Sequence, residues 1–78
     1  RIKSPATMVY EIYREVDSMV KQNLISHNII LSIHPDLADF IETDEMDTFR
    51  AIEKLLKGTI TIRTSEKFHL EQFEIFEA

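Results

Sequence analysis

The spacing of the apolar residues changes several times along this sequence of 78 residues, and these changes limit the folds it can adopt. Apolar residues recur at helical spacing over residues 5–22, where Ser4 suits the N-cap and Pro5 suits the first helical position. They alternate as in a strand over residues 28–34, 59–64 and 72–77. Residues 36–57 return to helical spacing, with a break and a new cap predicted at Thr43 or Asp44. The chain must therefore combine helices with strands.

These segments predict one α+β domain over residues 1–78, in the order α-β-α(α)-β-β. The helices are expected to pack on one face of a three-stranded mixed sheet. The first two strands, joined by a helical crossover, are expected to be parallel, and the third is expected to pair antiparallel with the second. Whether the third strand also lies between the first two stays open. Gly58, the only glycine, is expected to take a left-handed conformation just after the second helical stretch.

The composition excludes several classes of protein. The chain has no cysteine, so it contains no disulfide framework, no thiolate zinc site and no cysteine nucleophile. It has no run of about 18 apolar residues that could span a membrane. Nine basic residues against 14 acidic ones give a net charge of −5, which disfavours binding to nucleic-acid phosphates. The first residue is Arg1 rather than methionine, and we expect a fragment of a longer chain or a processed one.

The three histidines are candidate metal ligands or bases. His34 lies at a predicted junction between a strand and a helix, where we favour a capping role over a catalytic one. His27 and His69 lie in connecting segments and are expected to be solvated. The spacing of the three predicts no metal site.

A group of acidic residues surrounds the predicted break between the helices and could hold Mg²⁺ through its carboxylates. We favour the interpretation that these side chains stabilise a helix N-terminus, where the helix dipole attracts negative charge. The group consists of Glu42, Asp44, Glu45 and Asp47.

A group of basic residues is the only candidate for contacts with RNA. It consists of Arg50, Lys54, Lys57 and Arg63. The first three form a stripe at helical spacing, but Asp47 and Glu53 are placed to pair with Arg50 and Lys57, which favours a solvated, internally paired face. No GxxG clamp, aromatic stacking motif or glycine-rich phosphate loop accompanies the stripe. Composition and spacing therefore predict no catalytic and no metal-binding residues in this chain.

Three segments, in order, resemble parts of the ribonuclease E/G family. Residues 3–15 are similar to the run that follows the zinc-binding cysteines and begins the small C-terminal domain of the catalytic region. The matching residues are Lys3, Ser4, Thr7, Glu11, Ile12, Arg14 and Glu15. Residues 33–38 are similar to the family's strand-turn-helix segment, and residues 69–75 are similar to the strand that closes ribonuclease G-like proteins. Ala6 replaces the usual acidic residue of the first run. This departure affects the capping of the helix more than the resemblance to the family.

The resemblance implies a parent enzyme, a cytoplasmic bacterial endoribonuclease that cuts single-stranded, often AU-rich RNA. Such enzymes prefer a 5′-monophosphate, use Mg²⁺ held by carboxylates, and act in ribosomal RNA maturation and messenger RNA decay. A Cys-Pro-x-Cys zinc link joins their protomers. The catalytic aspartates, the 5′-end sensor and this link lie upstream in the family, so none of them maps onto these residues. The resemblance implies a chain that begins just after the link.

The family's small domain helps to organise dimers and dimers of dimers. The resemblance therefore implies a C-terminal oligomerisation domain that holds no cofactor and is not a catalyst by itself. Two alternatives stay open, an independent RNA-binding module with KH-like topology and an unrelated dimerisation domain. We also expect Tyr10 and one face of the second strand (Thr59, Thr61 and Arg63) to be exposed in this chain and covered in the full enzyme.

Overall fold

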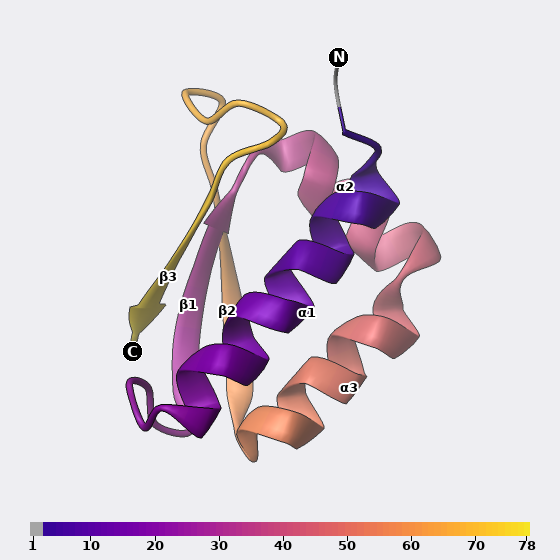
Figure 1. Ribbon diagram of the computed structural model, residues 1–78. Helices are drawn as coiled ribbons and strands as arrows, with labels where there is room; N and C mark the ends of the chain where they lie inside the picture. Colours follow the sequence, from indigo (N-terminus) through magenta and orange to yellow (C-terminus); the bar gives the residue numbers. More distant parts are fainter. Residues whose placement is uncertain (1–2) are drawn as a thin grey trace.

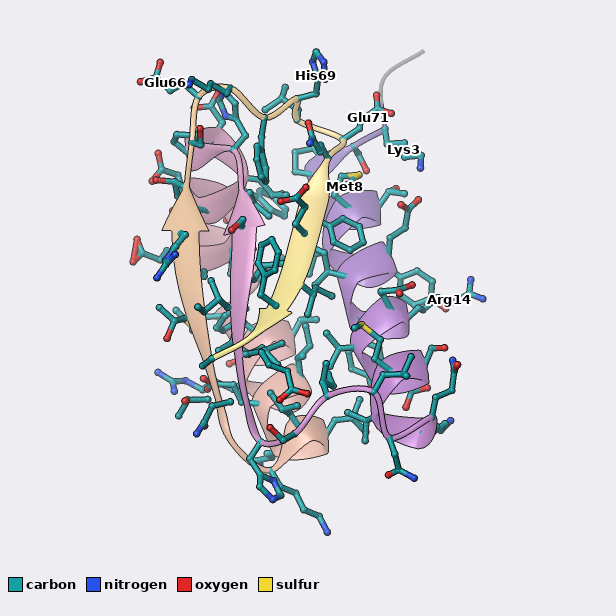
Figure 2. The ribbon with its side chains drawn as sticks, turned by 90° about the vertical axis from the view of Figure 1, so that its left-hand side faces the viewer. Lys3, Met8, Arg14, Glu66, His69 and Glu71 are labelled. Carbon is teal, nitrogen blue, oxygen red and sulfur yellow. The ribbon has the colours of Figure 1, made fainter. Side chains whose placement is uncertain are left out.

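The computed structural model describes residues 3–78, which form three helices and one three-stranded sheet (Figure 1). The elements are, in chain order, α1 (Pro5–Lys21), β1 (Asn28–Ile33), α2 (Pro35–Asp44), α3 (Met46–Leu56), β2 (Thr59–Thr64) and β3 (Phe73–Glu77). Figure 2 shows the three strands in front of all the helices, so the helices cover one face of the sheet and leave the other open. The predicted α+β class and element order are confirmed.

Helix α1 begins as its sequence predicts. The Ser4 hydroxyl oxygen accepts a hydrogen bond from the backbone N–H of Thr7 at 3.1 Å, and Pro5 occupies the first turn. The helix ends at Lys21, and its apolar stripe is buried against the rest of the domain. The buried residues of this stripe are Met8, Val9, Ile12 and Val16.

The predicted capping histidine is confirmed at the start of α2. The Nδ1 atom of His34 accepts a hydrogen bond from the backbone N–H of Asp36 at 3.0 Å. The same residue has an extended backbone, and Pro35 follows it in the first turn. The side chain of His34 therefore replaces a hydrogen bond that the first turn of a helix cannot make within itself.

We expect His34→Ala to lower the free energy of unfolding by about 1 kcal/mol, because it leaves the N–H of Asp36 without its acceptor. His34→Asn keeps a short polar side chain that can accept this hydrogen bond, and it should retain most of the stability. Urea unfolding followed by circular dichroism would compare the two variants with the unmodified chain. Equal losses in both variants would show that the cap contributes nothing measurable.

The break between α2 and α3 lies at Glu45, so the predicted caps Thr43 and Asp44 were wrong. Both of those residues still belong to α2. Glu45 leaves the helical conformation, its N–H donates to the carbonyl of Ile41, and its own carbonyl accepts from the N–H of Phe49. Its carboxylate accepts a hydrogen bond from the Thr48 hydroxyl at 2.9 Å. One residue thus ends one helix and begins the next.

The strand order is β2-β1-β3, with β1 in the centre. Strands β1 and β2 are parallel, as predicted, with Asn28 opposite Thr59. Strand β3 is antiparallel to β1, with Leu31 opposite Ile75, so the predicted pairing of the third strand with the second was wrong. The connection after β2 crosses the end of β1, where the N–H of Ser65 donates to the carbonyl of Ile33 at 3.1 Å. This crossing carries the chain to the free edge of β1.

The core lies between the sheet and the helices. Strand β1 contributes Ile29, Leu31 and Ile33 to it, as the predicted alternation requires. Its other members come from all three helices and from β2: Met8, Val9, Ile12, Val16, Leu37, Ile41, Phe49, Ile52, Leu56 and Ile60. Phe73 and Ile75 of β3 are half-buried and pack against this core.

The predicted left-handed conformation of Gly58 was wrong. Lys57 is the left-handed residue, with φ 61° and ψ 40°, while Gly58 has no positive φ. Lys57 occupies the position after the helix where glycine is usual. The N–H of Gly58 donates a hydrogen bond to the carbonyl of Glu53 at 3.2 Å, which closes the turn. A Cβ atom on Gly58 would lie 1.5 Å from the carbonyl oxygen of His27. Glycine is therefore required here by close backbone approach.

Candidate functional site

The histidines lie apart from one another, and the rings of His34 and His27 contact nearby backbone groups. His34 caps α2, and Nδ1 of His27 lies 3.5 Å from the carbonyl oxygen of Leu56 at the opposite end of the sheet. His69 is exposed in the connection before β3 (Figure 2). Across residues 3–78, no three or more His, Cys, Asp or Glu side chains are grouped so that they could hold a metal ion.

The acidic group is divided between two helix ends. Asp47 lies in the first turn of α3, where the helix dipole stabilises its negative charge, as predicted. Glu42 and Asp44 lie in the last turn of α2 instead, so the predicted N-terminal role is wrong for these two. Glu45 is half-buried and bound to Thr48. The carboxylates therefore have different local roles.

The basic group is also divided, between α3 and the sheet. Arg50, Lys54 and Lys57 are exposed along α3. On β2, Ile60 and Ile62 contact the core, so the alternation of the strand directs Arg63 to the open face of the sheet. The structure therefore does not bring all four together on one surface.

The predicted ion pairs of the basic stripe were wrong. Within the described part of the chain, none of the ion pairs involves Arg50 or Lys57. The carboxylate of Glu53 instead accepts a hydrogen bond from the backbone N–H of Ile60 at 3.0 Å. This contact ties α3 to the outer edge of β2, which no helical spacing rule could have indicated.

A groove runs between α1 and α3, which lie side by side in Figure 1. Tyr10 stands on its border with 61% of its surface exposed, which confirms the predicted exposure, and the Arg14 guanidinium lies 5.8 Å from the centre of its ring. The lining mixes apolar walls with an acidic border: Ala6, Val9, Tyr10, Tyr13, Glu45, Asp47, Thr48 and Ala51. Tyrosines on apolar surfaces are typical of protein interfaces.

The open face of the sheet is a second candidate surface. Thr59, Thr61 and Arg63 are exposed there, as predicted. Phe76 of β3 lies opposite Ile30 in the register and remains 49% exposed. Sequence reasoning did not single out Phe76, although the alternation over residues 72–77 already placed it on the face opposite to Ile75.

One end of the molecule joins three distant segments. The backbone N–H of Lys3 donates to the Glu71 carboxylate at 3.1 Å, and both residues lie at this end in Figure 2. The Lys3 ammonium also pairs with Glu11 at 2.9 Å, and this hydrogen bond and charge raise the pKa of Lys3. A hollow at this end is lined by Lys3, Pro5, Met8, Asp36, Leu37 and Leu70.

No protein-family model matches this chain, and no curated protein gives a significant match to it. Among residues 3–78, no helix combines the length and the apolar character needed to cross a bilayer.

Proposed function

We propose that this chain is the small C-terminal interaction domain of an endoribonuclease similar to the ribonuclease E/G family. It organises protein assembly and does not cut RNA by itself. The observation that carries this proposal is the meeting of the three resembling segments at one end of the fold. Lys3 of the first segment binds Glu71 of the third, and residues of all three line one hollow.

The residues of these segments have structural roles that suit a shared architecture. Ser4 caps α1 and His34 caps α2, so two of the matching positions determine where helices begin. Glu11 holds the side chain of Lys3. The matching residues cap helices and connect segments, so the resemblance supports a similar fold. It does not support a catalytic centre in this chain.

The available surfaces favour contacts with protein. The groove between α1 and α3 and the open sheet face both expose aromatic side chains, Tyr10 and Phe76. Aromatic residues are enriched in the centres of protein interfaces. In the parent enzyme these surfaces would be covered by other parts of the protein, while the catalytic carboxylates with Mg²⁺ and the zinc link would lie upstream of this chain.

A nuclease assay tests the proposed function. We expect a single-stranded RNA with a 5′-monophosphate to stay intact when incubated with this chain and Mg²⁺, because the proposed role supplies no catalytic carboxylates. Gel electrophoresis of end-labelled RNA would measure cleavage, with the same mixture in excess chelator as the control. Cleavage that requires the metal and grows with the concentration of the chain would contradict the proposal.

Binding of the same RNA distinguishes the KH-like alternative. With a net charge of −5 and a divided basic group, the chain is expected to show no saturable binding at physiological salt. Binding that weakens with salt, and that is lost when Lys54 and Lys57 are replaced by glutamate, would favour an RNA-binding module instead.

A further inference from the structure

The two edges of the sheet differ in how their backbone groups are satisfied. The N–H of Thr59 donates to the carbonyl of His27, just before β1, and the N–H of Ser65, just after β2, donates to the carbonyl of Ile33. By alternation, Ile60, Ile62 and Thr64 direct their backbone groups outward. The outward N–H of Ile60 is bound by the Glu53 carboxylate at 3.0 Å. Helix α3 therefore protects this edge at its beginning only, since within residues 3–78 the outward N–H groups of Ile62 and Thr64 make no hydrogen bond.

The outer edge of β3 has no such protection. The N–H of Ala78 donates to the carbonyl of Asn28 at 3.0 Å, so Phe73, Ile75 and Glu77 direct their backbone groups away from β1. Within residues 3–78, no side chain or backbone group hydrogen-bonds to these outward groups. Figure 2 shows β3 as the border strand, with α1 farther back and on the outer side of β3. Unpaired backbone groups of this kind are a template for a further strand.

The sequence of β3 is complementary to itself when two copies run antiparallel. If Ile75 lies opposite Ile75 of the second copy, Phe73 lies opposite Glu77 and Glu74 opposite Phe76. No carboxylate then faces another carboxylate, which would destabilise the pair. The two Phe76 side chains become diagonal neighbours on the open face, within reach of each other.

Neighbouring registers are less favourable. A shift of one step in one direction places Glu74 directly opposite Glu74 of the second copy. A shift in the other direction leaves Phe73 and Glu74 without a strand residue opposite them. The register centred on Ile75 is therefore the one that pairs all five residues of β3 without opposing like charges.

We propose that a second copy of this chain pairs with the outer edge of β3, antiparallel and centred on Ile75. The product is a continuous six-stranded sheet in the order β2-β1-β3-β3-β1-β2 with helices on one face. This inference rests on the proposed function, because it supplies the surface through which the interaction domain associates with itself. Five paired residues on each side form a small contact, so the dimer is a weak one that exchanges with monomer.

Proline substitutions at the two edges test the pairing. Ile75→Pro removes an outward N–H of β3 and leaves the ladder to β1 intact, whereas Thr64→Pro removes an outward N–H of β2 as a matched control. Sedimentation equilibrium from tens of micromolar to about 1 mM would measure association. We expect Ile75→Pro to weaken association at least tenfold, and Thr64→Pro to leave it unchanged.

Amide hydrogen exchange of the unmodified chain gives a second measurement that does not depend on how a variant folds. The N–H groups of Ile75 and Glu77 should become protected as the chain concentration rises, while those of Ile62 and Thr64 should not. A chain that stays monomeric throughout, or that associates without protecting Ile75 and Glu77, would overturn the β3 proposal. Association through another surface would leave the proposed function standing, and that function would instead be overturned by metal-dependent RNA cleavage.

Discussion

Replacing Gly58 with alanine is expected to destabilise the chain by on the order of 4 kcal/mol, at the upper end of single substitutions. The added Cβ atom would lie 1.5 Å from the carbonyl oxygen of His27 and 2.4 Å from its carbonyl carbon. Both are backbone atoms of the residue just before β1, and the adjacent N–H of Thr59 donates to the same oxygen at 3.1 Å. The clash can be relieved only by separating the first residues of β1 and β2. Thermal unfolding followed by circular dichroism would measure the loss.

Lys57→Gly is the matched comparison. Lys57 has φ 61°, a conformation that costs ordinary residues about 1–2 kcal/mol and that glycine adopts freely. We therefore expect this variant to be as stable as the unmodified chain or more stable by up to about 1 kcal/mol. If Gly58→Ala cost less than about 1 kcal/mol while Lys57→Gly destabilised the chain, the observed conformation of this turn would be contradicted.

Truncating Leu31 to alanine is expected to cost about 2–5 kcal/mol, because it leaves a cavity in the centre of the core. Leu31 is 1% exposed and lies on the central strand, between Ile62 of β2 and Ile75 of β3 in the register. A domain of this size has a total stability of roughly 4–12 kcal/mol, so the substitution would remove a large part of it. Each kcal/mol should lower the melting temperature by about 4–8 °C.

Leu24→Ala removes the same atoms from a side chain that is 57% exposed, and it serves as the control. We expect this variant to unfold within about 0.5 kcal/mol of the unmodified chain, as surface substitutions usually do. Comparable losses at positions 24 and 31 would mean that β1 is not the buried centre of the sheet.

The positions of the helices and strands could be predicted from the sequence because they depend on neighbours within one or two turns. The apolar stripe of α1, the caps at Ser4 and His34, and the alternation of Ile29, Leu31 and Ile33 are all local signals. The helix break lies at Glu45, one or two residues after the predicted Asp44 or Thr43. Several polar residues there can end a helix, and only the backbone hydrogen bonds select one.

The candidate surfaces were predicted less well, because they depend on which elements become neighbours. The exposure of Tyr10 followed from its place opposite the apolar stripe of α1, but the groove beside it exists only because α3 packs alongside. Helical spacing predicted an ion pair between Glu53 and Lys57. In the structure, the Glu53 carboxylate instead accepts a hydrogen bond from the N–H of Ile60. That backbone group becomes available only once β2 is an edge strand.

By itself, the sequence determined the element types, the buried face of each element and the α+β class, since these follow from side-chain periodicity along the chain. Tertiary structure alone decided that β1 is central, that β3 has a free edge and that Gly58 must lack a side chain. The reason is physical. Strand order and close backbone approach depend on contacts between residues far apart in the chain, such as Gly58 with His27, and no local pattern records them.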